Sequence, residues 1–140
     1  MNKEIKPLKF SGKWDFDPAP ESVDHISLKE QYGLFINGKF ENPQTGNYFP
    51  SINPANEEHL SMIAEAGEKD INAAVSAARK AFDGPWSKMS AKERGKYIFR
   101  IARLIQEKSR ELAVIETLDG GKPIRESRDV DVPIAAAHFF

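Results

Sequence analysis

Apolar residues change their spacing along the chain, and the first pattern is typical of β-structure. Between residues 33 and 64, short aromatic and aliphatic runs alternate with turn-forming residues. We predict strands at residues 34–40 and 47–52, joined as a hairpin or as two linked edge strands through the turn at 42–46. A third strand is predicted at His59 to Ala64.

From residue 71 onward the apolar spacing becomes helical. Apolar residues three and four apart form one face over residues 71–82, and Gly84-Pro85 predicts the end of that helix. The stretch from Ser90 to Glu93 has the pattern of a capping box, so a long second helix is expected to run from there to Gly120-Gly121. Gly95 inside this helix costs about 1 kcal/mol relative to alanine, so we expect another segment to pack closely against it.

A third helix is predicted from Pro123 or Ile124 toward Phe140, with Pro133 expected to kink it. Its last residues are apolar and carry no stop signal, so we interpret the sequence as a fragment whose final helix is cut in mid-course. Residues 1–32 show no sustained periodicity and predict an arm that lies over another surface. The predicted fold class is α/β, with short β-strands or a hairpin followed by three helices.

Composition and charge exclude several classes of function. The chain has 140 residues, of which 40% are hydrophobic and 29% charged, as is ordinary for a folded globular protein. With 20 basic against 21 acidic residues, no excess of charge predicts binding to nucleic acid or to an anionic membrane surface. No stretch has the length of a membrane span and the start lacks a secretory signal, so we expect a cytoplasmic location.

The side chains offer no complete catalytic constellation. There is no cysteine, which excludes a thiolate metal site and a cysteine nucleophile within these residues. His25, His59 and His138 share no metal-ligand spacing, and His138 is expected to be a partly buried residue with a hydrogen-bond partner rather than a base. The alternating charges of residues 125–131 predict a solvated, salt-bridged face.

Asp119 is the one acid in an unusual position. It lies at the carboxyl end of the predicted second helix, where unsatisfied carbonyl groups disfavour a negative charge. A cation held by this carboxylate and nearby carbonyl oxygens would offset that cost. Lys122, or a backbone N–H in the following turn, would also offset it. On the residues alone we favour Lys122 or the backbone N–H over the cation.

The chain resembles the NAD(P)-dependent aldehyde dehydrogenase family in several linked stretches, which include LFINGKF, FPSINPA and ELAVIETLDGGKPIRESRDVDVP. The resemblance covers about residues 33 to 140 and matches the amino-terminal third of the family. It implies that residues 33–140 are an incomplete amino-terminal portion of a Rossmann-like NAD(P)-binding domain. It also implies NAD or NADP as cofactor, and a homo-oligomer, dimer or tetramer, for the full-length protein.

The resemblance further implies a reaction. In the family a cysteine attacks the aldehyde, hydride passes to the nicotinamide, and water activated with the help of a glutamate hydrolyses the thioester. All of these residues would lie beyond Phe140, so this chain alone is expected to be inactive. Two other hypotheses stay open: a noncatalytic aldehyde-dehydrogenase-like scaffold or oligomer partner, and a small interaction module that folds by itself.

Two kinds of site follow from the resemblance, residue by residue. Many family members hold a structural sodium or potassium ion, and the matching positions here are the backbone oxygens of Ser51 and Ile52 and the carboxylate of Asp119. With this implied role, the cation becomes the favoured explanation for Asp119, ahead of Lys122 or a backbone N–H. Side chains that line the aldehyde tunnel in family members match Val130 and Ile134.

The sequence departs from the family pattern in two places. After the acid, threonine, asparagine or serine is common, whereas this chain has Gly120, so a looser loop is expected there. The arm that precedes Tyr32 is also longer than in many members. It predicts a subgroup that the sequence does not identify.

Overall fold

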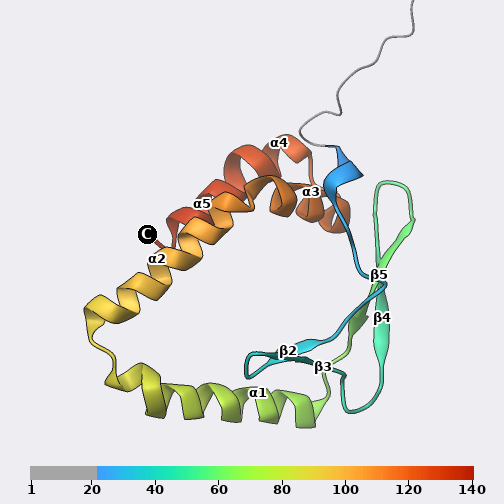
Figure 1. Ribbon diagram of the computed structural model, residues 1–140. Coiled ribbons are helices and arrows are strands. Elements are labelled where there is room, and N and C mark those ends of the chain that lie inside the picture. The colour runs from blue at the N-terminus through green and yellow to red at the C-terminus, as the bar shows by residue number, and fades with distance from the viewer. Residues whose placement is uncertain (1–21) are drawn as a thin grey trace, which may run out of the picture.

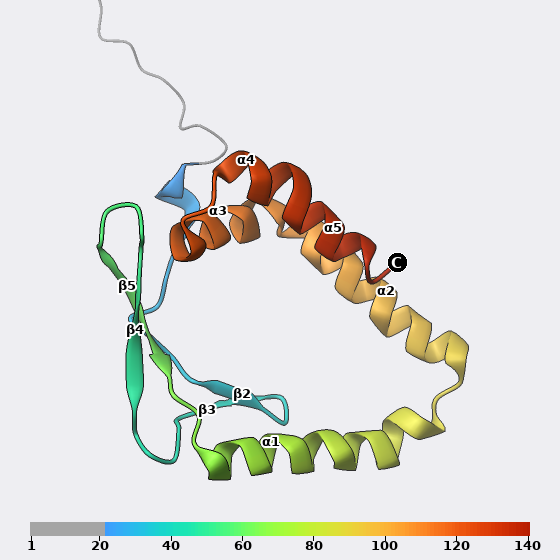
Figure 2. The ribbon, with the colours of Figure 1, turned by 180° about the vertical axis from the view of Figure 1, so that it is seen from behind.

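The computed structural model describes residues 22–140, so residues 1–21 of the predicted arm lie outside the described part. The elements follow one another around a frame (Figures 1 and 2): strands form one side, the first helix a second, and the remaining helices a third. The strands are β1 (Gln31–Tyr32), β2 (Leu34–Ile36), β3 (Lys39–Glu41), β4 (Tyr48–Ile52) and β5 (His59–Ala64). The helices are η1 (Val23–His25), α1 (Glu68–Ala81), η2 (Phe82–Trp86), α2 (Ala91–Glu107), α3 (Ser109–Gly120), α4 (Ile124–Glu126), η3 (Ser127–Asp131) and α5 (Val132–Ala137).

Strand β5 is the centre of a three-stranded sheet of order β1-β5-β4. It pairs antiparallel with β4, where Ser51 lies opposite Ser61, and parallel with β1, where Gln31 lies opposite Met62. The strand predicted at residues 59–64 is therefore confirmed. The last two residues of the predicted arm, Gln31 and Tyr32, are part of this sheet.

The strand predicted at residues 34–40 is in fact two strands joined by a tight turn. Asn37 and Gly38 both have positive φ, 52° and 79°, as a two-residue hairpin turn requires. Of the two connections expected through residues 42–46, the hairpin is wrong, because β3 and β4 belong to different sheets. The alternative of two linked edge strands agrees with the structure, since β4 is at the edge of the three-stranded sheet and β3 belongs to the two-stranded sheet. Aromatic and aliphatic residues continue on both sides of the Asn-Gly pair, so the apolar run hid the turn.

The loop at residues 42–46 is attached to the start of α1 by a buried carboxylate. Asp70 is 4% exposed and accepts the backbone N–H of Gln44 at 3.1 Å and that of Gly67 at 2.9 Å. A buried charge is costly unless it is hydrogen-bonded, and these two donors satisfy it. The carboxylate also lies in the first turn of the helix, where negative charge is favourable. Asp70 therefore fixes α1 relative to the strands.

The long second helix is bent into α2 and α3. Its predicted capping box is confirmed: the Glu93 N–H donates to Ser90 Oγ at 3.2 Å, and the Ser90 N–H donates to the Glu93 carboxylate at 2.9 Å. Lys108 alone leaves helical geometry, with φ −103° and ψ 15°, although the Leu112 N–H still reaches its carbonyl oxygen at 2.9 Å. The apolar stripe keeps its spacing across the bend, so periodicity does not reveal it.

The third helix begins at Ile124, as predicted, but it is not uniform. The Val132 N–H bonds the carbonyl of Ser127, five residues back, which makes η3 a π-turn. This wider turn lies directly before Pro133, whose ring would collide with a carbonyl of a regular helix. The chain accommodates the proline in this way. The last helical residue is Ala137, so the helix runs toward Phe140 as predicted, and the interpretation that it is cut in mid-course stays a prediction.

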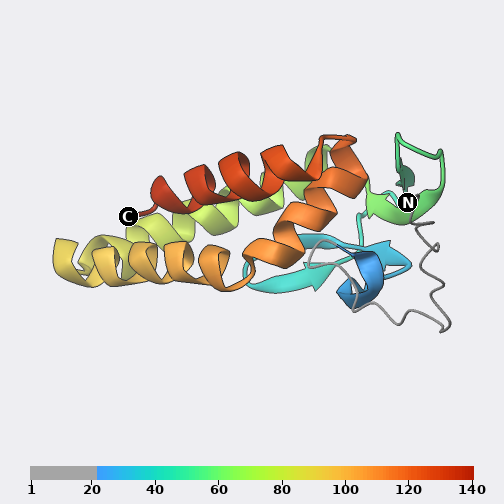
Figure 3. The ribbon, with the colours of Figure 1, turned by 90° about the horizontal axis from the view of Figure 1, so that it is seen from above.

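Few large apolar side chains are buried in the described residues. Figure 3 shows α5 running beside α2, and the hydrophobic residues buried on these two helices are Ala102, Val132 and Ala136. The predicted apolar face of α1 is open, because Ile71 is 53% and Val75 61% exposed. Ala74 and Ala78 of the same face border a groove against the β2–β3 turn, so the described residues cover this face only in part. The buried hydrophobic residues are Ala64, Ala102, Ala113, Val114, Val132 and Ala136.

Gly95→Ala is expected to stabilise the chain. The close packing predicted at Gly95 is absent, since no atom of the described residues lies within 4 Å of an added Cβ. Alanine should therefore add about 1 kcal/mol of helix propensity and raise the melting temperature by a few degrees, measured by circular dichroism. Gly38→Ala is the matched control, because its site is equally open but has φ +79°. A melting temperature that falls in Gly95→Ala would show that another segment occupies that space.

Candidate functional site

The end of β4 and the end of α3 meet at one contact. The hydroxyl of Ser51 donates to Asp119 Oδ1 at 2.5 Å, across 68 positions of sequence. Two of the three residues assigned to the cation by resemblance are thus neighbours in space. The third, Ile52, is the last residue of β4, directly after Ser51. The assignment concerns its backbone oxygen, and it stays a prediction.

Lys122 pairs with Asp131, so the part of the favoured explanation that assigned Lys122 to Asp119 is wrong, whereas a backbone N–H in the following turn stays a prediction. The Lys122 ammonium group forms an ion pair with the carboxylate of Asp131, and Glu116 lies 4.0 Å away. The hydrogen bond to Asp131, together with the charge of the nearby acids, raises the pKa of Lys122 above its usual value. Within residues 22–140 the partner that Asp119 is seen to have is the hydroxyl of Ser51, and a hydroxyl brings no positive charge.

The turn after Asp119 is held by a glycine. Gly121 has φ +66°, and its N–H closes the end of α3 on the carbonyl of Thr117 at 3.0 Å. An added Cβ on Gly121 would lie 2.6 Å from Cγ of Pro54, so the turn packs directly on the segment after β4. Gly120 belongs to α3 itself, so the loop expected to be looser begins one residue later.

The contact of Ser51 with Asp119 brings a hydroxyl oxygen and a carboxylate together, and the resemblance adds backbone carbonyl oxygens of β4. A carboxylate, a hydroxyl and backbone carbonyl groups are hard ligands, which suit alkali and alkaline-earth cations better than transition metals. Asp119 also lies at the carboxyl end of α3, where the helix carbonyls add partial negative charge. The residues therefore fit a monovalent cation. Among residues 22–140, no group of three or more His, Cys, Asp or Glu side chains could hold a metal ion.

Val130 and Ile134 lie on the third helix and are exposed at 46% and 50%. Val130 is part of the π-turn η3, and Ile134 is part of α5. They do not line the nearby groove of about 440 Å³, so their assignment to an aldehyde tunnel stays a prediction. That groove is lined by Ile105, Leu112, Glu116, Asp131, Val132 and Ala135.

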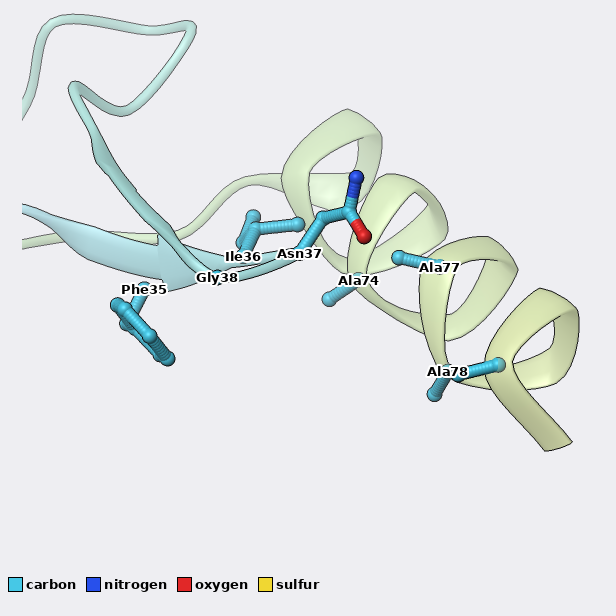
Figure 4. A pocket seen from close by; sticks show the side chains of 8 residues that line it. Phe35, Ile36, Asn37, Gly38, Ala74, Ala77 and Ala78 are labelled. Atoms are coloured by element: carbon cyan, nitrogen blue, oxygen red, sulfur yellow. The ribbon is translucent and has the colours of Figure 1, made fainter. Parts of the chain in front are cut away.

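A second groove, of about 390 Å³, lies between the β2–β3 turn and α1. In Figure 4 the side chain of Asn37 points toward α1, whereas Phe35 points away from it. The helix side of the groove consists of Ala74, Ala77, Ala78 and Ala81. None of its lining side chains titrates, so it offers no general acid or base.

The histidines occupy separate places in the described structure. His59 Nε2 lies 3.4 Å from the sulfur of Met62, and His138 Nδ1 lies 2.7 Å from the carbonyl oxygen of Ile134. His138 thus has the hydrogen-bond partner that was expected, but it is exposed rather than partly buried. None of the helices in residues 22–140 is long and apolar enough to cross a membrane.

A sequence profile described as "Aldehyde dehydrogenase family" matches residues 40–140. The chain belongs to the aldehyde dehydrogenase family. It is 46% identical over 123 residues to aldehyde dehydrogenase family 2 member B4, mitochondrial, of Arabidopsis thaliana, covering 86% of this chain and 23% of that one. It is 44% identical over 107 residues to aldehyde dehydrogenase (NAD(P)+) 2 of Saccharomyces cerevisiae, covering 76% and 21%.

The solved structures agree with this membership. The fold resembles the aldehyde dehydrogenase of Bacillus cereus in complex with NAD+, with a TM-score of 0.76 and 43% identity over 79% of this chain and 23% of that chain. The indole-3-acetaldehyde dehydrogenase in its apo form gives a TM-score of 0.77 at 34% identity, over 84% of this chain and 27% of that chain. The predicted α/β class is confirmed. The chain spans less than a quarter of the length of the curated relatives named above.

Proposed function

We propose that these residues are the amino-terminal portion of an NAD(P)-dependent aldehyde dehydrogenase. The full-length protein would convert an aldehyde, NAD(P)+ and water into a carboxylic acid, NAD(P)H and a proton. The family match over residues 40–140, together with the likeness to a structure that holds NAD+, is the observation that supports the proposal. The chain has no cysteine, so the thiolate that the family uses must come from other residues.

The contribution of this segment would be to cover and support the cofactor domain. Its helices present apolar side chains that the described residues leave open, among them Val75 on α1 and Phe99 on α2. Burying apolar surface stabilises a fold by about 25 cal/mol per Å², so these faces would gain from lying against a sheet. A Rossmann-like sheet supplied by the rest of the protein is the surface that the family resemblance assigns to them.

The cation site would join the end of β4 to the end of α3. A sodium or potassium ion held by Asp119 and the backbone oxygens of Ser51 and Ile52 would offset the charge of the carboxylate at the end of α3. The ion would have a structural role, because none of these atoms belongs to a reacting group. Val130 and Ile134 would border the path of the aldehyde, since both side chains are exposed on the third helix.

Several parts of the proposal rest on the family alone. The arm at residues 1–32 and the incomplete domain at 33–140 stay predictions, as do the homo-oligomeric state, dimer or tetramer, and the choice between NAD and NADP. The cytoplasmic location also stays a prediction, since one relative carries the name mitochondrial. The alternative hypothesis, a noncatalytic scaffold, is tested by the experiment that follows.

Aldehyde oxidation by the full-length protein is the decisive measurement. We expect reduced nicotinamide to form with a panel of aliphatic and aromatic aldehydes, and we expect none with this chain alone, because it has no thiolate. Replacing the family cysteine downstream by alanine should abolish turnover without loss of fold. A full-length protein that has no such cysteine, and that oxidises none of the aldehydes with either cofactor, would be a scaffold instead.

A further inference from the structure

We infer that the Lys122–Asp131 ion pair selects the π-register of the third helix and so fixes the direction in which Ile134 points relative to Val130. Lys122 and Asp131 would then be positioning residues for aldehyde selectivity. The inference rests on the proposed function in one respect only, namely that Val130 and Ile134 border the aldehyde path. The part that concerns the register stands on the geometry of the described residues.

The π-turn η3 has a regular helix as its alternative. In the structure the Val132 N–H donates to the carbonyl of Ser127, five residues back. A regular α-helix would draw the same donor to the residue four back. Because one residue turns an α-helix by about 100°, a change of register in η3 would rotate α5 relative to α4 by about that angle. Ile134, which lies in α5, would change direction with it.

The ion pair joins the two ends of the segment that can change register. Lys122 comes directly after the left-handed Gly121, before α4, and Asp131 is the last residue of η3. The two charged groups are in contact across nine positions, and their side chains are 37% and 29% exposed. A rotation of about 100° at Asp131 would carry its carboxylate away from the ammonium group. The pair is therefore compatible with one register and opposes the other.

A second contact holds the beginning of the same turn. Ser127, the first residue of η3, is fully buried, and its hydroxyl accepts that of Thr117 on α3 at 3.2 Å. The start of the π-turn is thus anchored to α3 by a packed hydroxyl pair. The end of the turn is anchored to the α3–α4 connection by the ion pair. With the start fixed in this way, Lys122 and Asp131 act together with Pro133, which disfavours a regular turn, in setting how the helix continues toward Ile134.

Lys122→Met tests the inference, because methionine keeps most of the aliphatic stem and removes the charge. Amide exchange at residues 128–132 of the full-length protein is the first readout. A part-exposed ion pair is screened by solvent and contributes modestly, so we expect exchange about three- to fivefold faster. The second readout is the ratio of kcat/KM for a short and a bulky aldehyde, expected to shift by a similar factor. Lys122→Arg should restore both values.

Lys108→Met is the matched control. It removes the exposed pair of Lys108 with Glu111, 2.9 Å apart, which lies outside the π-turn, and both readouts should stay unchanged. If Lys122→Met leaves amide exchange at residues 128–132 unchanged, the ion pair does not select the register and the inference is overturned. Asp131→Asn gives the same test from the other partner and should reproduce the faster exchange.

Val130→Phe separates a failure of the inference from a failure of the proposed function. Suppose that Val130→Phe changes the ratio of kcat/KM between the two aldehydes. If Lys122→Met then speeds amide exchange but leaves that ratio unchanged, the register does not control aldehyde selectivity and this part of the inference is overturned. If the ratio responds to neither substitution, the tunnel assignment of the proposed function is wrong. A full-length protein with no activity still reports the register through amide exchange.

Discussion

Gly121→Ala is expected to lower the free energy of unfolding by about 2–4 kcal/mol. Gly121 has φ +66°, a conformation that costs an L-residue about 1–2 kcal/mol. The new Cβ would also lie 2.6 Å from Cγ of Pro54, closer than atoms approach without a shift, and overpacking of this kind costs about 1–3 kcal/mol. Urea denaturation followed by circular dichroism, with an unchanged m-value, measures the loss.

The neighbouring glycine supplies the control for this prediction. Gly120 belongs to α3, and nothing lies within 4 Å of its added Cβ, so Gly120→Ala should be neutral or slightly stabilising. A double variant with Pro54→Ala should recover the part of the loss that is due to crowding, but not the part that is due to φ. If Gly121→Ala proved as stable as Gly120→Ala, the turn would not be packed on the segment after β4 as described.

Asp119→Ala is expected to abolish the dependence of stability on sodium or potassium in the full-length protein. A cation present at 100 times its Kd stabilises the folded state by about 2.7 kcal/mol, and that increment would disappear. The substitution also removes the hydrogen bond from Ser51, at 2.5 Å, which contributes about 0.5–1.5 kcal/mol at an exposed position. Thermal unfolding over a range of potassium chloride concentrations measures both losses.

Ser51→Ala distinguishes the cation from the hydrogen bond. It removes the hydroxyl that donates to Asp119 but leaves the backbone oxygen that the cation would use. The small hydrogen-bond loss should remain in this variant, and so should the response to potassium. Choline chloride at equal ionic strength controls for screening of exposed charges. A potassium response that survives in Asp119→Ala would place the cation elsewhere or show that the effect is nonspecific.

Elements with a strong local signal could be predicted from the sequence. The capping box at Ser90 and Glu93 placed the start of α2, and the alternating run at residues 59–64 placed β5. The Asn37-Gly38 turn carried an equally local signal, but the apolar residues on both sides made one strand look continuous. In that region the hairpin signal of the Asn-Gly pair was the better guide.

Departures from regular helix could not be predicted in the same way. The bend at Lys108 leaves the apolar spacing intact, and the π-turn before Pro133 changes one hydrogen bond without changing composition. The charges of residues 125–131 were expected to form a solvated face. Arg128 and Asp129 do pair at 2.7 Å, whereas Asp131 turns toward Lys122. The pairing of Asp131 with Lys122 depends on both the turn at Gly121 and the π-register of η3, and neither can be read from the spacing of charges.

The candidate site depended on contacts between distant parts of the chain. Periodicity and spacing identify Asp119 as a misplaced charge but say nothing of Ser51, because no local rule connects a strand end with a helix end. The family resemblance brought the two residues together, and the structure places their side chains in contact. The apolar faces of α1 and α2 follow from the spacing of their residues, and within residues 22–140 Val75 and Leu104 on these faces stay 61% and 40% exposed.

The link between Ser51 and Asp119 also bears on the order of folding. It closes a loop of 68 positions, and the entropic cost of closure grows with the logarithm of loop length, whereas the β2–β3 hairpin and the single helices need only neighbouring residues. We expect this contact to form after the transition state, which the chevron plot of Ser51→Ala would test through a change in the unfolding rate alone. A bound ion at Asp119 would therefore slow unfolding and leave the refolding rate nearly unchanged, so salt would govern how long the native state lasts.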